Sequence, residues 1–72
     1  MRELRYDPEV DAAYVTIGAP IVDGGVARTV PVDLPDSIAG ELFLDFDEHG
    51  HLLGVEVLGA SALLRPELLR GR

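Results

Sequence analysis

Hydrophobic and polar residues alternate along much of this chain, and the alternation predicts β-strands. Successive side chains of a strand point to opposite faces of a sheet, so residues two positions apart share a face. Segments 41–46 (ELFLDF) and 52–58 (LLGVEVL) both follow this pattern. Their apolar faces consist of Leu42, Leu44 and Phe46 in the first segment and of Leu53, Val55 and Val57 in the second. We expect these residues to form the core.

Short segments rich in valine, leucine and aromatic residues are separated by clusters of Gly, Pro and Asp, which is typical of strands joined by tight turns. We predict strands over residues 3–6, 13–17, 26–32, 41–46 and 52–58. The connections are too short for the crossovers that parallel strands need, so the strands are expected to form an antiparallel meander.

The turn between the last two strands must leave both apolar faces on the same side of the sheet. This condition requires an even number of loop residues. A two-residue turn at His49 and Gly50 satisfies it, and a four-residue turn from Asp47 to Gly50 preserves the same faces. The resulting cross-strand pairs are Phe46 with Leu53, Leu44 with Val55 and Leu42 with Val57.

The C-terminal segment ASALLRPELLRGR has leucines at helical spacing, at positions 63, 64, 68 and 69. Ser61 is a candidate N-cap. Pro66 would break a continuous helix, so we predict one short turn near residues 61–64 and a second that begins at Pro66, both with their leucines on the sheet. The predicted fold class is α+β: a single antiparallel β-meander sheet of about five strands with short C-terminal helical turns packed on one face, in one domain spanning residues 1–72.

The length of the chain limits its core. A domain of 72 residues hides only about 60% of its unfolded surface, and the chain has no cysteine for a disulfide. Phe43, Leu52 and Leu58 add apolar surface on the second face of the sheet, and the two edge strands leave backbone groups unpaired. We therefore expect a homodimer. The absence of cysteine also fits a reducing compartment, and we expect a cytoplasmic protein.

Charge narrows the choice of partners. Six arginines oppose 13 Asp and Glu residues, which gives a formal net charge of −7. No basic stripe is present, so direct binding to nucleic acid is not expected. An acidic body attracts cationic proteins, so a small basic protein is the expected partner. The C terminus is locally basic, with Arg65, Arg70 and Arg72, and is free to meet an acidic partner or a neighbouring subunit. No apolar run approaches the ~20 residues needed to span a membrane, and the N-terminal segment lacks the apolar core of a signal peptide.

Segment 45–56, DFDEHGHLLGVE, fits the calcium-loop pattern D-x-[DN]-x-[DN]-G-x5-E at Asp45, Asp47, Gly50 and Glu56, but places His49 at the fifth position. A calcium loop of this type curls between two helices, whereas strands flank this segment. An extended ladder cannot bring six oxygen ligands together, and histidine is a poor ligand for a hard cation. We interpret the segment as a hairpin and expect no tight calcium binding.

Other chemistry is also weakly supported. His49 and His51 suit a transition metal, with Asp47 as a third ligand, but an exposed loop tip gives such a site no shelter. The alternative function is a metal-dependent or hydrolytic enzyme. Its candidate residues are Asp45, Asp47, His49, His51 and Glu56, with Ser37 as a distant nucleophile. No G-x-S-x-G motif surrounds that serine, and a single sheet provides no deep pocket. We predict no catalytic, cofactor-binding or metal-binding residues.

The segment YDPEVD is predicted to end a strand and turn. Asp7 caps the turn through its side chain, Pro8 presets φ for the next position, and Asp11 closes the turn. Tyr14, in the following strand, faces either the core or an interface, and the core is favoured.

Two segments in order, YDPEVDAAYVTI at residues 6–17 and LDFDEHGHLLGVEVLGAS at residues 44–61, carry a family resemblance. The chain resembles the small bacterial domain-of-unknown-function family 2283, whose members have a YDPEADALYI-like opening and a DYDxDGRLVGIEIL-like second half. The resemblance implies the meander with a terminal helix and implies no reaction. Some members are encoded beside small toxin-like proteins, which suggests an antitoxin-type partner. The segment LPDSIAGE, residues 34–41, is an insertion relative to that pattern.

The function predicted from these observations is that of a small protein-interaction module, acting through association as an antitoxin-like partner of a small basic protein. Catalysis by the hairpin carboxylates and histidines remains the alternative.

Overall fold

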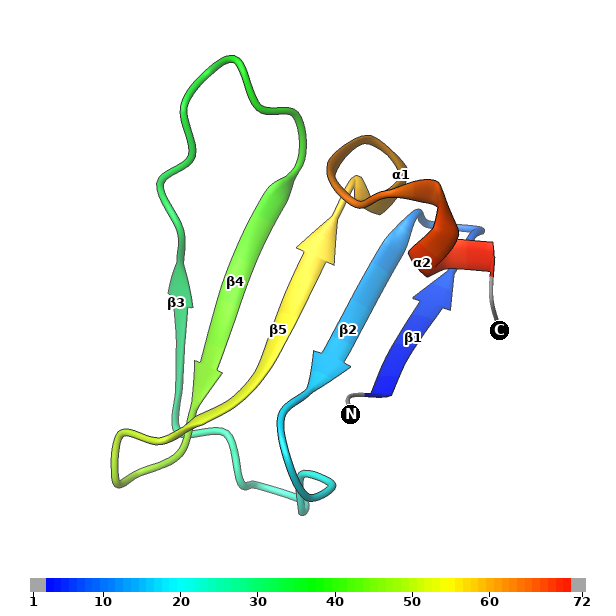
Figure 1. Cartoon of the computed structure of the whole chain (residues 1–72). Coiled ribbons are helices and arrows are strands. Elements are labelled where there is room, and N and C mark those ends of the chain that lie inside the picture. Colours follow the sequence, from blue (N-terminus) through cyan, green and yellow to red (C-terminus); the bar gives the residue numbers. More distant parts are fainter. Residues whose placement is uncertain (1–2, 71–72) are drawn as a thin grey trace.

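The computed structural model describes residues 3–70, which form a five-stranded antiparallel sheet with two short helices (Figure 1). The strands are β1 (Glu3–Asp7), β2 (Ala12–Thr16), β3 (Arg28–Pro31), β4 (Glu41–Phe46) and β5 (Leu52–Leu58), followed by α1 (Ala60–Leu63) and α2 (Pro66–Arg70). The predicted α+β class is confirmed. β4 and β5 have the predicted bounds, whereas β3 is shorter than the predicted segment 26–32.

The strand order in the sheet is β1-β2-β5-β4-β3, which differs from a simple meander at one connection. β2 pairs with β5, and residues 17–27 carry the chain past the ends of β5 and β4 to the far edge (Figure 1). This path covers three strand spacings, about 15 Å, which an extended segment of this length reaches easily. Every pairing remains antiparallel, as predicted.

The β4–β5 register confirms two of the three predicted pairs, Leu42 with Val57 and Leu44 with Val55. The third is wrong, because a bulge between Asp45 and Phe46 places Phe46 opposite Leu52 instead of Leu53. The turn also differs from both predicted lengths. The Asp47 amide donates to the His51 carbonyl at 2.9 Å, which leaves residues 48–50 as a three-residue loop. A loop with an odd number of residues would place the apolar side chains of β4 and β5 on opposite faces of the sheet. The extra residue in β5 returns them to the same face.

The core lies between the sheet and the two helices, over β2 and β5. Its fully buried residues are Ala13, Val57 and Ala60, with exposed fractions of 2%, 3% and 0%. Packed against them are Leu4, Tyr6, Leu42, Val55, Leu63, Leu64 and Leu69. Three of the predicted core residues, Leu44, Phe46 and Leu53, are only half-buried and lie outside this cluster. Leu68, which was expected on the sheet, is 49% exposed.

Asp11 fixes the start of α1. The N-cap of α1 is Gly59, with φ 70°, so the prediction of Ser61 as N-cap is wrong. The Ser61 amide and hydroxyl instead donate to the Asp11 carboxylate at 2.9 and 2.7 Å, and Tyr6 donates its hydroxyl to the same carboxylate at 2.7 Å. Asp11 therefore joins the β1–β2 turn to α1, in addition to closing the turn. Asp7 caps that turn as predicted, accepting from the Glu9 amide at 3.0 Å.

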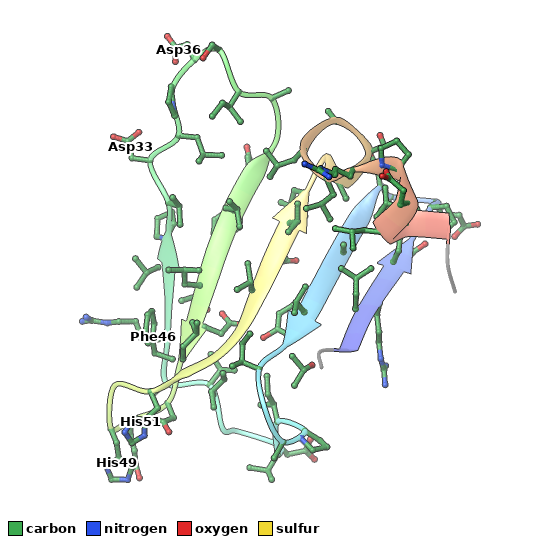
Figure 2. The ribbon with its side chains drawn as sticks, viewed as in Figure 1. Asp33, Asp36, Phe46, His49 and His51 are labelled. Carbon is green, nitrogen blue, oxygen red and sulfur yellow. The ribbon has the colours of Figure 1, made fainter. Side chains whose placement is uncertain are left out.

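Neither helix in residues 3–70 combines the length and the apolar character that crossing a membrane would take. The insertion at residues 34–41 forms the connection from β3 into β4, which extends past the end of the sheet (Figure 1). Asp33 and Asp36 lie on the outer side of this connection (Figure 2). Arg72 lies outside the described residues, and the side chain of Arg70 is not described, so the prediction for the basic C terminus stays a prediction.

Candidate functional site

The tip of the β4–β5 hairpin is organised by the carboxylate of Asp47. One of its oxygens accepts from the backbone amides of His49 and His51, both at 2.9 Å. Gly50 donates its amide to the Asp47 carbonyl at 3.1 Å and adopts φ 85°, a conformation that favours glycine. The calcium-like pattern of D, H and G residues in this segment therefore encodes a tight turn.

These hydrogen bonds lower the pKa of Asp47. The His51 amide is the largest cause, opposed by some desolvation and assisted by the His49 amide and by the nearby imidazoles. A carboxylate that accepts backbone N–H groups in its ionised form is held as an anion at neutral pH. Asp47 is thus engaged in stabilising the turn.

The two histidines sit at the hairpin tip and project away from the sheet (Figure 2). Nε2 of His49 lies 3.6 Å from a carboxylate oxygen of Glu48, and Nδ1 of His51 lies 3.5 Å from a carboxylate oxygen of Asp47. The His49 and His51 side chains are 71% and 78% exposed, so both contacts are weak surface pairs. Within residues 3–70, no group of three or more His, Asp or Glu side chains is arranged to hold a metal ion.

The other members of the candidate cluster lie elsewhere. Asp45 and Glu56 occupy the face of the sheet opposite the helices, where Glu56 stands between Tyr14 and Phe43. Ser37 is exposed in the β3–β4 connection, at the opposite end of β4 from the hairpin. The structure therefore does not bring the proposed acid, base and nucleophile together.

A polar network that the sequence did not predict crosses the second face of the sheet. Tyr14 donates its hydroxyl to one oxygen of Asp45 at 2.7 Å, and Thr29 donates to the other oxygen at 2.6 Å. The ring of Tyr14 lies across Gly54 of β5, where a side chain would collide with the ring. Desolvation, followed by the hydrogen bond to Asp45, raises the pKa of Tyr14 to about 12. Tyr14 is therefore outside the helix-covered core in which it was expected.

The helix-facing side of the sheet contains a groove of about 670 Å³ over β3, β4 and the hairpin. Figure 1 shows α1 and α2 over the other half of the sheet, with no helix over β3 and β4. The groove residues are Ala27, Arg28 and Val30 from the β3 side, Leu44 and Phe46 from β4, and Asp47, Glu48 and Gly50 from the hairpin. Leu44 and Phe46 were predicted to lie in the core. They are only half-buried because they line this open groove.

Carboxylates dominate the rest of the surface. Among residues 4–69, eight Asp and Glu residues but only three arginines are exposed. The acids are Asp7, Glu9, Asp23, Asp33, Asp36, Glu41, Glu48 and Glu67, and the arginines are Arg5, Arg28 and Arg65. This excess gives the described surface a net negative charge.

These features define a small α+β domain with an open apolar groove and an acidic surface. The chain belongs to the family of proteins of unknown function DUF2283, whose sequence pattern matches residues 3–61. The match confirms the resemblance carried by the two motifs. No curated protein and no solved structure shows a significant match to the chain.

Proposed function

We propose that this protein is an interaction module that forms a homodimer and binds a small basic protein through its acidic surface. The observation that carries the proposal is the open groove, because it leaves the apolar face over β3 and β4 without cover. Among residues 4–69, only three hydrophobic residues are buried, whereas seven large hydrophobic residues are at least 38% exposed. So small a core leaves little margin of stability, and association with a second chain is a common remedy.

The proposed second partner follows from charge. The exposed carboxylates outnumber the exposed arginines in the described part of the chain, in keeping with the net charge of −7. An acidic surface speeds encounter with a cationic protein and can occupy the site where that protein would bind nucleic acid. An antitoxin-like role, in which the module neutralises a small basic toxin, is the form of this proposal that we favour. The lack of cysteine supports a cytoplasmic setting.

Light scattering of the purified chain tests the homodimer. We expect a mass near twice the 7.8 kDa of one chain at micromolar concentration. A mass that stays at 7.8 kDa while the concentration rises about tenfold would contradict self-association.

Co-expression with the product of the neighbouring gene tests the basic partner. We expect the two proteins to co-purify at about 50 mM salt and to separate at about 500 mM, because exposed charges are screened at high ionic strength. Neutralising two exposed acids of the β3–β4 connection, Asp33→Asn with Asp36→Asn, should weaken the complex and reduce its dependence on salt. A complex that survives high salt and ignores these substitutions would contradict a charge-driven contact.

A further inference from the structure

One continuous row of apolar side chains runs across the helix-facing side of the sheet, and only part of it is covered. The paired residues of the row are Val30, Leu44, Val55, Val15 and Leu4, from β3 to β1. Leu4 and Val55 pack against the buried cluster beneath the helices. Val30 and Leu44 instead line the groove. The groove is thus an extension of the core that lacks a covering layer.

The edge of the sheet next to the groove is poorly suited to pairing with another strand. The Val32 amide donates to the Leu42 carbonyl at 2.9 Å, so position 32 faces β4. Backbone groups alternate in direction along a strand, so position 31 faces outward. That position is Pro31, which has no N–H group to donate. A partner is therefore better accommodated on the face of β3 and β4 than along the β3 edge.

Side chains of opposite charge line the groove. Arg28 stands on the β3 side, whereas Asp47 and Glu48 stand at the hairpin tip. Asp47 is engaged with the backbone of the turn, but the Glu48 side chain is 80% exposed. Arg28 is exposed too, and it forms no ion pair with the residues described. An apolar floor flanked by side chains of both charges can pair with a second copy of itself.

We propose that this groove is the homodimer interface, in which two copies pack face to face about a two-fold axis and Arg28 of each chain meets Glu48 of the other. In such an interface a contact of residue i with residue j occurs twice, once in each direction. Val30, Leu44 and Phe46 of the two chains then cover one another and complete the core. The inference rests on the proposed function only in assuming that the chain self-associates, since the surface assignment is tested separately.

Charge reversal provides the test. Arg28→Glu places a carboxylate opposite Glu48, and Glu48→Arg places a guanidinium opposite Arg28, so each variant should weaken its own homodimer by roughly tenfold, because the altered pair occurs twice. Both positions are exposed, so each variant should melt as a folded protein. The double variant, Arg28→Glu with Glu48→Arg, should recover the parent dissociation constant. An equimolar mixture of the two single variants should form a heterodimer more tightly than either variant associates alone.

Sedimentation equilibrium measures the dissociation constants of the parent, the two single variants, the double variant and the mixture. Arg65→Glu, at an exposed arginine between α1 and α2, is the matched control because it makes the same charge change away from the groove. The control should dimerise like the parent. If the parent dimerises but Arg28→Glu and Arg65→Glu weaken it equally, and the mixture shows no preference, the groove assignment is wrong while self-association stands. If the parent is monomeric, the homodimer of the proposed function fails together with this interface.

Discussion

A single carboxylate, that of Asp11, supplies the acceptor that helix α1 lacks at its start. The N-cap residue Gly59 has no side chain to receive the free backbone N–H groups of the first turn. Asp11 reaches these groups from the β1–β2 turn and accepts from the Ser61 amide and hydroxyl. Its backbone adopts φ 55°, which asparagine tolerates better than most residues. Asp11→Asn therefore removes the charge with little strain in the turn.

We expect Asp11→Asn to lower the melting temperature at neutral pH and to reduce the loss of stability in acid. Hydrogen bonds from the Tyr6 hydroxyl and then from Ser61 lower the pKa of Asp11. A folded-state pKa below the unfolded value gives stabilisation that is complete above about pH 4 and is lost as the pH falls below it. Thermal unfolding followed by circular dichroism at several pH values measures the effect. Glu9→Gln, an exposed carboxyl of the same turn, is the control, and equal acid dependence in the parent and Asp11→Asn would contradict the assignment.

The contact of Tyr14 with Asp45 predicts an unusual tyrosine titration. With Tyr6→Phe as background, Tyr14 is the one tyrosine left in the chain. Its pKa, raised to about 12, means that the folded state keeps the phenolic proton above the ordinary value near 10. The stabilisation linked to this proton is complete below about pH 10 and is lost as the pH rises through the folded value. Spectroscopic titration of tyrosinate should show a lower pKa in Asp45→Asn and in Gly54→Ala, and an unchanged value in either would contradict the contact.

The sequence contained one signal for this network. Glycine weakens a strand, so Gly54 in the middle of β5 indicated that another group approaches closely there. The approaching group could not be identified, because Tyr14 reaches Gly54 only through the β2–β5 pairing. A pattern of alternating residues assigns Tyr14 to a face, but it does not determine which strand lies beside β2.

The same limit applies to the strands themselves. β4 and β5 were predicted with their observed bounds because their alternation is regular and ends at turn residues. The alternation of apolar and polar residues fits a sheet in which β3 lies next to β2 as well as one in which β5 does. Residues 17–27 are long enough for either arrangement. The bulge that places Phe46 opposite Leu52 instead of Leu53 compensates for a loop with an odd number of residues. The pattern of apolar residues is the same with both features as with neither, so the sequence alone reveals neither of them. Faces and segments were therefore predictable, whereas neighbours and exact register were not.

The β3 edge strand gives a prediction of its own. Pro31 removes a donor from the outward side of β3, which protects an exposed edge from pairing with further chains. Pro31→Thr restores this donor and adds a residue with good strand propensity, so we expect species larger than the proposed dimer to appear as concentration rises. Light scattering over a concentration series detects them. Pro20→Thr, an exposed proline outside the strands, is the control. Identical mass distributions for both variants would show that Pro31 does not protect the edge.

In the whole molecule, apolar burial and charge act in opposite directions on self-association. Each chain carries a formal charge of −7, so two copies repel one another at long range. At physiological ionic strength this repulsion is screened beyond about 8 Å, whereas burial of the groove floor acts at contact. Salt weakens the two proposed Arg28–Glu48 contacts less than it weakens this repulsion, because these groups meet within the screening length, so we expect dimerisation to strengthen with added salt. A basic partner, in contrast, is expected to bind more weakly as salt increases, so the two kinds of association can be separated by one variable.

Two truncations of apolar side chains distinguish stability within the chain from stability that comes from the proposed dimer. Val57 is 3% exposed beneath the helices, so Val57→Ala should cost about 2 kcal/mol and shift every melting temperature downward. Leu44 is half-buried on the groove floor, so most of the cost of Leu44→Ala should fall on the dimer. A dimer that unfolds to two chains melts at a higher temperature as its concentration increases.

Melting temperatures of the parent and both variants over a hundredfold concentration range, roughly from 1 to 100 μM, make this comparison. Val57→Ala should keep the concentration dependence of the parent, because it leaves the groove intact. Leu44→Ala should lose most of that dependence, because its weakened dimer dissociates within this range and the folded monomer then unfolds without a mass-action term. If Leu44→Ala retained the full concentration dependence of the melting temperature, the Leu44 side chain would contribute only to the stability of the single chain. The groove over β3 and β4 would then have to be covered by a different protein.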